Sequence, residues 1–383
     1  MISSAEFAAY NRAVARIGDK AASDVESSVL AWCRANASAS VAEKREAAKL
    51  IMDGYIQGYD DIAAVFAAEW YDRRAQKSGV ALDQAITTTT YKPESVDAVA
   101  RYQAKKLAKG GDAEFAKACG EFARNDAFRS LNETIVANVG RDRDKGARFA
   151  RVPTGLETCT FCLMLASRGA VYHTRKSAGE WKHFHRGCDC KVVPSFERDP
   201  YAEVVEGVKP RELQERYKVF KQIDSMETLD DSNKKELKER ALEVDVGSIA
   251  GKKLGSVKYV KQRDLLEEHE KAGIDYLLLN GFDVETVVED PDAPANLDIS
   301  MNDELWEMKN LTNCASSVSN QVKRARIKWF KLGLSSPSRC VFTNEGNRDR
   351  FGETCAALEK RRRHGEVFLT VSGSGVIRVL KDK

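Results

Sequence analysis

Apolar and polar positions follow helical spacing over the first 150 residues of the chain. Residues 1–92 contain no proline and four glycines, and they are dense in Ala, Glu, Lys and Arg, which favour helix. The pattern predicts helices over residues 5–36, 40–74, 95–109 and 112–139. The second begins with a capping-box sequence, Ser40-Val-Ala-Glu43. We interpret the aromatic residues that recur along it as helix core: Tyr55, Tyr59, Phe66, Trp70 and Tyr71.

The C-terminal third changes to short apolar runs between helical stretches. A helix within 259–281 ends at Asn280-Gly281, a common stop signal. After it the pattern predicts strands over 283–288, 297–301, 305–309, 340–343, 367–371 and 376–380. It predicts further helices over 316–332 and 351–363. Helix, three strands, helix and strand in this order indicate an α/β core.

A highly charged region lies between these parts. It carries predicted helices at 210–220 and 231–242, and a glycine-spaced segment at 247–255 that we interpret as a linker. We therefore expect a multidomain α+β protein with an all-helical N-terminal domain and a C-terminal α/β domain. The predicted domains are a helical scaffold or assembly domain 1–150, a Cys/His module 151–200, a charged helical linker 201–255 and an α/β domain 256–383.

The composition is that of a chain able to bury hydrophobic cores, with 43% hydrophobic and 31% charged residues among 383. The N-terminus has no basic region followed by an apolar run. No stretch approaches eighteen uninterrupted apolar residues. We expect neither a signal peptide nor a membrane span.

Four of the nine cysteines cluster in the middle of the chain. Cys-x(2)-Cys is followed after 22 residues by His-x(2)-Cys-x-Cys, and thiolates with imidazole suit tetrahedral zinc. The pattern predicts a structural Zn²⁺ held by any four of Cys159, Cys162, His185, Cys188 and Cys190. The alternative is a set of reduced cysteines without metal. We interpret His173 and His183 as ordinary loop histidines.

This cysteine segment resembles a known family. The two cysteine pairs enclose Leu165-Ala-Ser-Arg-Gly-Ala-Val-Tyr172, and Val193-Pro194 follows the second pair. The whole is similar to the minor capsid and head-morphogenesis proteins of tailed bacteriophages, the phage Mu F-type group. The resemblance implies a role in virion assembly, a place in the phage head interior and then the host cytoplasm, and portal or capsid proteins as partners.

Residues 296–310 predict a hairpin that carries acidic groups at both ends. Side chains alternate faces along a strand, so Glu307 and Lys309 project together and Asp298 lies opposite across the pair. Two carboxylates and a lysine at one point suit a divalent metal that activates water against a phosphodiester. The alternative is that these charged residues are surface decoration that recurs by chance.

Charge is distributed unevenly around the hairpin. Residues 264–307 hold fourteen acids and one base, whereas residues 309–383 hold sixteen Lys and Arg and six acids. An acidic part next to a basic part is what a nuclease needs to hold metal and phosphate side by side. Two solvated faces of opposite sign are the alternative.

The C-terminal domain resembles the PD-(D/E)xK nuclease superfamily, restriction-endonuclease-like in fold, and more closely the nuclease toxins of contact-dependent inhibition. The resemblance implies Asp298 and Glu307 as ligands of Mg²⁺ or Mn²⁺ and Lys309 as the catalytic lysine. Glu270, with Glu267 as its rival, is then the helix carboxylate, and Gln321 the glutamine of the next helix. Leu297 replaces the proline of the motif, which leaves Asp292, after Pro291, as a rival for Asp298.

The leading hypothesis is a phage minor head protein with a C-terminal metal-dependent endonuclease. The toxin resemblance implies RNA, particularly tRNA, in preference to DNA as substrate, and a cognate immunity protein as a further partner. Two alternatives stay open. One is a purely structural minor capsid protein whose α/β domain is a catalytically inactive interaction module, and the other is a bacterial polymorphic toxin.

Overall fold

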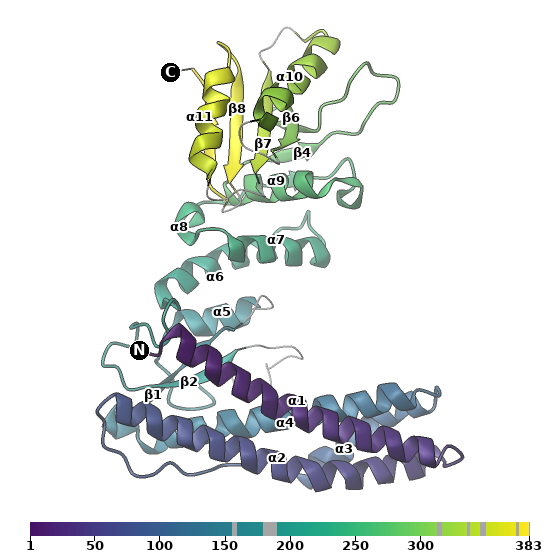
Figure 1. Cartoon of the computed structure of the whole chain (residues 1–383), viewed down its shortest axis with the longest axis vertical. Helices are drawn as coiled ribbons and strands as arrows, with labels where there is room; N and C mark the ends of the chain where they lie inside the picture. The colour runs from purple at the N-terminus through teal and green to yellow at the C-terminus, as the bar shows by residue number, and fades with distance from the viewer. Residues whose placement is uncertain are drawn as a thin grey trace. The chain divides into compact units, whose positions relative to one another are not determined.

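The computed structural model shows a multidomain α+β protein with a helical N-terminal region and a C-terminal sheet, as the sequence predicts (Figure 1). It describes residues 1–154, 159–178, 190–311, 316–334, 338–344, 350–372 and 375–382. The chain forms two compact units, Met1–Leu213 and Gln214–Lys383. We call them the helical unit and the sheet unit.

Long helices make up most of the helical unit. They are α1 (Ser4–Ala35), α2 (Val41–Lys77), α3 (Pro93–Leu107) and α4 (Asp112–Arg141), close to the predicted bounds. The backbone amide of Ser40 donates to Glu43 Oε2 at 2.7 Å and the amide of Glu43 to Ser40 Oγ at 3.3 Å. This reciprocal cap confirms the predicted start of α2. Pro93 opens α3, where its missing N–H costs no helical hydrogen bond.

The aromatic stripe of α2 is core over its second half. Trp70 and Tyr71 are buried, and the ring of Tyr10 on α1 stacks on Trp70 with centroids 4.5 Å apart. Tyr55 is 37% exposed, so the core prediction was wrong at that position. The Tyr55 hydroxyl accepts a hydrogen bond from Ser28 Oγ at 3.2 Å near the surface, where the polar end of a tyrosine can also reach water.

A small two-stranded sheet completes the helical unit. The sheet consists of the antiparallel strands β1 (Arg148–Val152) and β2 (Lys191–Ser195). The helices η1 (Arg143–Lys145) and α5 (Thr160–Ser167) accompany it. Buried Phe149 and Val192 join the same core as Tyr71 of α2. The described strands of this segment are therefore packed onto the long helices.

The sheet unit begins within the charged region. It holds α6 (Pro210–Asp224), whose first residues belong to the helical unit, α7 (Asp231–Glu243) and α8 (Val246–Ile249). The expected linker at 247–255 differs from the observed division after Leu213. Ile249 and Leu254 are buried in the sheet unit, so this glycine-spaced segment packs onto the unit through these two side chains.

Seven strands form one mixed sheet in the order β3-β4-β5-β6-β7-β8-β9. The strands are β3 (Val257–Lys258), β4 (Val284–Thr286), β5 (Ile299–Met301), β6 (Glu304–Asn310), β7 (Arg339–Asn344), β8 (Val367–Ser372) and β9 (Ile377–Leu380). The pairs β3-β4, β6-β7 and β7-β8 are parallel, and the others are antiparallel. Parallel pairing needs a crossover, which α10 supplies between β6 and β7 and α11 between β7 and β8.

Helices cover both faces of this sheet (Figure 1). The helices are η3 (Arg263–Leu265), α9 (Glu268–Leu279), α10 (Ser316–Lys331) and α11 (Phe351–Arg361). Buried side chains of α10 and α11 form one core with Cys340 and Phe342 of β7. On the other face Gly273 lets α9 lie close to Met308 of β6, because a Cβ there would stand 2.3 Å from Met308 Cε.

We find no helix in the described parts of the chain with the length and apolar character needed to cross a membrane.

Candidate functional site

The hairpin β5-β6 positions the candidate site. Its two turn residues, Asn302 and Asp303, have φ of 52° and 61°, as a two-residue turn between twisted strands requires. Ile299 pairs with Trp306, and Asp298, which precedes β5, donates its amide to the carbonyl of the same Trp306. The two acids lie close together, as the sequence predicts, because one ammonium, Lys328 Nζ, contacts both of them.

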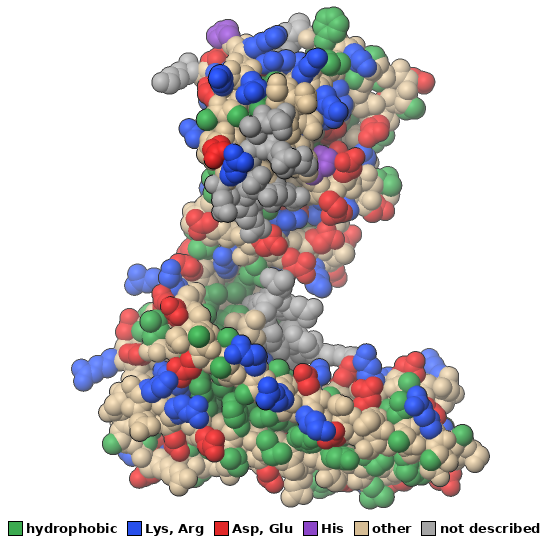
Figure 2. Space-filling model, in the orientation of Figure 1, with side chains coloured by type: hydrophobic (Ala, Val, Ile, Leu, Met, Phe, Trp, Pro, Cys, Tyr) green, Lys and Arg blue, Asp and Glu red, His purple; other side chains and the backbone are tan. Residues whose placement is uncertain are grey.

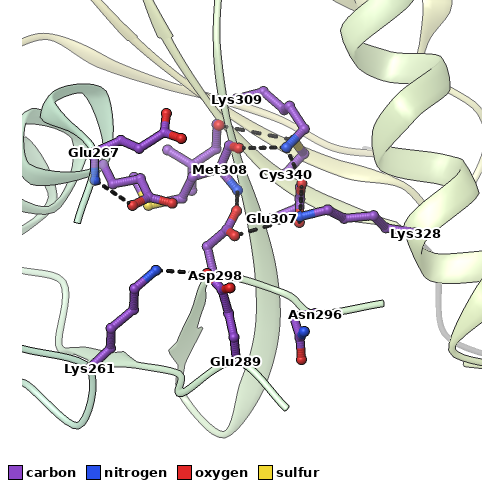
Figure 3. A network of polar contacts seen from close by, with 12 residues as sticks. Lys261, Glu267, Glu289, Asn296, Asp298, Glu307, Met308, Lys309, Lys328 and Cys340 are labelled. Atoms are coloured by element: carbon purple, nitrogen blue, oxygen red, sulfur yellow. Dashed lines mark hydrogen bonds and ion pairs between the residues drawn. The ribbon is translucent and has the colours of Figure 1, made fainter. Parts of the chain in front are cut away.

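The Asp298 carboxylate is anchored to β6. Its Oδ2 accepts a hydrogen bond from the backbone amide of Met308 at 2.6 Å, and its own amide donates to Trp306 O at 3.1 Å (Figure 3). The Asp298 side chain is 17% exposed. It is therefore held in one orientation with an edge open to solvent.

Glu307 is the buried centre of the site. Its side chain has 0% exposure and pairs with the ammonium groups of Lys309 and Lys328, the latter at 2.7 Å (Figure 3). Lys309 Nζ also donates to Met308 O at 3.0 Å. Lys328 Nζ lies 3.7 Å from Asp298 Oδ1. Lys328 of α10 thus contacts both carboxylates, and Lys309 of β6 contacts Glu307.

The electrostatics follow from this burial. Burial raises the pKa of Glu307, and the charge of Asp298 adds to the rise while the two lysines oppose it. Burial also works against the charged form of Lys328, but its hydrogen bond to Glu307 and the charge of Asp298 outweigh burial and raise the pKa of Lys328. Cys340, paired with Glu307 across β6-β7, is a fully buried thiol whose pKa is raised by burial.

Glu270 lies at the start of α9, outside this set of ion pairs. Its Oε2 accepts from the Glu267 amide at 2.8 Å and caps the helix. The charges of Glu270 and Asp298 both contribute to the raised pKa of Lys261, whose largest cause is a hydrogen bond to Glu289. Glu270 therefore caps α9 and, together with Asp298, stabilises the charged form of Lys261.

Gln321 lies on α10 at the rim of the site. Its Nε2 donates to Asn310 O at 3.4 Å, and no donor among the described residues reaches its buried Oε1. An open groove runs past it, lined by Glu267, His269, Lys309, Gln321, Arg324 and Lys328. The helix carboxylate rival Glu267 and the glutamine thus face one groove together with Lys309.

The structure brings together Asp298, Glu307 and Lys309. Asp292 lies in the loop between β4 and β5, where its amide donates to Asp290 Oδ1 at 2.9 Å. Lys328 was not singled out as a site residue from the sequence. The available signal was its position seven residues after Gln321, which places both on one face of α10.

The donor set of this site suits a hard divalent cation. Carboxylate oxygens are the preferred ligands of Mg²⁺ and Mn²⁺, and Asp298 and Glu307 supply them from adjacent strands. Lys328 Nζ lies between these carboxylates, so a cationic group already bridges them. Within the described part of the chain, no group of three or more His, Cys, Asp or Glu side chains could hold a metal.

The zinc prediction falls partly outside the described residues, because His185 and Cys188 belong to 179–189. Cys159 is the N-cap of α5, where its Sγ accepts from the Cys162 amide at 3.4 Å. Cys162 and Cys190 are buried. The zinc site stays a prediction.

Comparisons with known proteins place the chain among bacteriophage proteins. It is similar to the Gene 15 proteins of Mycobacterium phages D29 and L5, with 36% and 33% identity over 13% of this chain. Those matches cover 28% and 29% of the relatives, so the chain spans less than a third of their length. The family model described as VG15 protein matches residues 1–220, more than half of the chain, and the chain belongs to this family.

The family match ends before the sheet of the sheet unit begins. No solved structure matches the chain. Family membership therefore concerns the helical unit, and the chemistry of the sheet unit has to be argued from its own residues.

Proposed function

We propose that this protein is a structural component of a phage head, of the head-morphogenesis type and located near the portal, whose sheet unit is a divalent-metal-dependent nuclease. Membership of the VG15 family and similarity to phage proteins support the first part. The arrangement of Asp298, Glu307 and Lys309 supports the second. The observation that carries it is Lys328, a cation lodged between two carboxylates on adjacent strands.

The element order of the sheet unit also supports a nuclease. Helix α9, strands β4, β5 and β6, helix α10 and strand β7 follow one another in the order of the PD-(D/E)xK core. An acid directly precedes β5, and Glu307-x-Lys309 lies on β6. A chance motif would have no reason to bring these acids and the lysine together at one hairpin.

The chain's own groups fit phosphodiester hydrolysis. A divalent cation bound to Asp298 and Glu307 would supply an activated water and a counter-charge for the phosphate. Lys309 is 18% exposed and faces the groove, where its ammonium can orient the attacking oxygen. Lys328 holds Glu307 in the ligand-free site and, once displaced, can neutralise charge on the phosphate. Water adds across one P–O bond.

RNA is the substrate that we propose, with tRNA as the first candidate, because the sheet unit resembles the toxin nucleases. The same resemblance supports an immunity protein as a partner of the sheet unit. A nuclease carried in a phage head would enter the host together with the genome.

Cleavage by the full-length protein tests the nuclease. Labelled tRNA, single-stranded RNA and DNA are incubated with the protein and Mg²⁺ or Mn²⁺, beside the variants Lys309→Ala and Asp298→Asn. We expect each variant to lose on the order of 100-fold in rate and EDTA to abolish cleavage. Lys258→Ala, which removes an exposed lysine of β3, is the control and should cleave normally. Equal cleavage by all variants would reveal a contaminant.

A second function is favoured by the burial of Glu307. With 0% exposure and two lysine partners, this carboxylate is charge-balanced without a metal, as in a purely structural interaction domain. Melting curves separate the two candidates, because a ligand that binds the folded state raises Tm. A nuclease should melt at higher temperature in millimolar Mn²⁺, and Asp298→Asn should remove that shift. An unchanged Tm together with no cleavage would favour the structural role.

A further inference from the structure

Helix α10 has a third face, which meets the candidate site at its edge through Ile327 alone. Its core face is buried and carries Val318, Val322, Ala325 and Trp329. Its site face carries Gln321, Arg324 and Lys328. The remaining face repeats at positions i, i+4 and i+7 and carries Lys323, Ile327 and Phe330, and Leu334 follows in the segment after the helix ends at Lys331.

The apolar residues of this remaining face are open to solvent. Phe330 is 86% exposed, more than any other hydrophobic side chain among the described residues, and Ile327 and Leu334 are 45% and 39% exposed. A phenylalanine ring left in water gains nothing for the fold. Its exposure indicates a surface that a ligand covers.

Cationic groups surround Phe330. A groove runs between α10 and the end of α11, lined by Lys323, Phe330, Leu334, Arg361, Arg363 and His364. Figure 2 shows Lys and Arg side chains gathered over the α10 and α11 end of the sheet unit. Lys323 and Arg363 make no ion pair with any described carboxylate. Among the described residues that line the groove the one acid is Glu366, which is buried and paired with Arg326 at 2.7 Å, while His364 lies 3.0 Å from Asp382 beside it.

This groove continues into the candidate site. Ile327 lines both the groove beside Phe330 and the groove that contains Lys309 and Lys328. One extended chain can therefore pass from the site over Ile327 to Phe330. Arg324 on one side and Lys323 on the other extend the positive charge along the whole path.

We propose that this groove binds a single-stranded segment of nucleic acid, with phosphates on Lys323 and Arg363 and a base stacked on Phe330. The proposal rests on the proposed nuclease function and names the form of its substrate. Unpaired bases expose faces that can stack on an aromatic ring, whereas the bases of a duplex are covered by their neighbours. An exposed ring among unpaired cations is the chemistry that recognises single strands.

Binding without cleavage tests the groove independently of catalysis. The full-length protein is titrated in EDTA against fluorescent oligouridylate and oligothymidylate of about twelve nucleotides and against a duplex of equal length. We expect Phe330→Ala to weaken single-strand binding about 5- to 100-fold. Lys323→Ala and Arg363→Ala should each lower the slope of log Kd against log salt by about 0.7. Tyr201→Ala and Lys109→Ala, exposed residues of the helical unit, are the matched controls.

Each outcome has one meaning. Single-strand binding that needs Phe330 supports the groove even if nothing is cleaved, in which case only the nuclease fails. Unchanged affinity of Phe330→Ala, or duplex binding that equals single-strand binding and responds alike to the variants, would overturn the proposal. Competition by polyglutamate as strong as by oligouridylate would also overturn it, because the groove would then fit an acidic protein.

Discussion

At the scale of single residues, the proposed metal site depends on how the Glu307 carboxylate is paired. Its carboxylate is buried, its pKa is raised by burial, and Lys309 and Lys328 compensate it. The alternation of a strand was sufficient to predict that Glu307 and Lys309 project together and that Asp298 faces them. Lys328 was missed although it shares a helix face with Gln321, because the spacing alone does not say which carboxylate that face of the helix meets.

Removing Lys328 should cost stability in a pH-dependent way. A carboxyl with a raised pKa in the folded state stabilises the fold fully below its unfolded pKa, and this stability is lost as pH rises through the folded value. Lys328→Ala raises the folded pKa of Glu307 further. We expect a loss at pH 8 that is smaller than the roughly 3–5 kcal/mol of a wholly unpaired buried charge, since Lys309 remains, and a smaller loss at pH 5. Urea unfolding measures both, and equal losses would contradict the account.

A second buried carboxylate makes the stability of the helical unit depend on pH. Asp60 of α2 is fully buried beside Asp126 of α4 and accepts from Ser130 Oγ at 2.7 Å. Burial, and then the charge of Asp126, raise the pKa of Asp60 to about 7. Because the folded pKa exceeds the unfolded one, Asp60 destabilises the unit increasingly as pH rises from about 4 to 7.

Asp60→Asn should therefore stabilise the helical unit at pH 8, by on the order of 2 kcal/mol relative to its effect at pH 5. Asparagine keeps an oxygen that can accept from Ser130. Thermal melting at the two pH values, with Asp61→Asn on the exposed side of α2 as control, checks this. An equal change in melting temperature for both variants between the two pH values would contradict the destabilising role of Asp60.

At the scale of elements, local signals account for most of what the sequence predicted. Ser40 and Pro93 begin helices, and Asn302-Asp303 turns the hairpin. The pairing of β6 with β7 was not predictable, because strands separated by a crossover helix carry no local mark of their neighbour. The burial of Ile249 was missed for a similar reason, since it depends on partners that are distant in the sequence.

Close packing of α1 on α4 gives a prediction at this scale. A Cβ on Gly120 of α4 would stand 2.5 Å from the backbone carbonyl of Ala22, which cannot move aside as a side chain can. Gly120→Ala should destabilise by about 1–3 kcal/mol although alanine favours helix. Gly54 of α2 has open space around it, so Gly54→Ala should stabilise by about 0.5–1 kcal/mol. Urea midpoints of the two variants that move in the same direction would contradict this packing.

At the scale of the whole molecule, the family match and the proposed nuclease site lie in different parts of the chain. The VG15 match covers residues 1–220, and the proposed nuclease and its groove lie in the sheet unit. If the chain is a head component, mass spectrometry of purified virions that encode it should find peptides of both units, at equal abundance, inside tail-less heads. Their absence from heads, with the protein present in the lysate, would contradict the structural role.

The most direct test of the central claim is the anomalous scattering of Mn²⁺ in crystals of the full-length protein. The account predicts one anomalous peak bound by Asp298 and Glu307, with the Lys328 ammonium displaced from between them. The Asp298→Asn crystal, soaked identically, should lack the peak. A wild-type crystal in which Lys328 still bridges the two carboxylates in millimolar Mn²⁺, with no peak at that position, would contradict the claim.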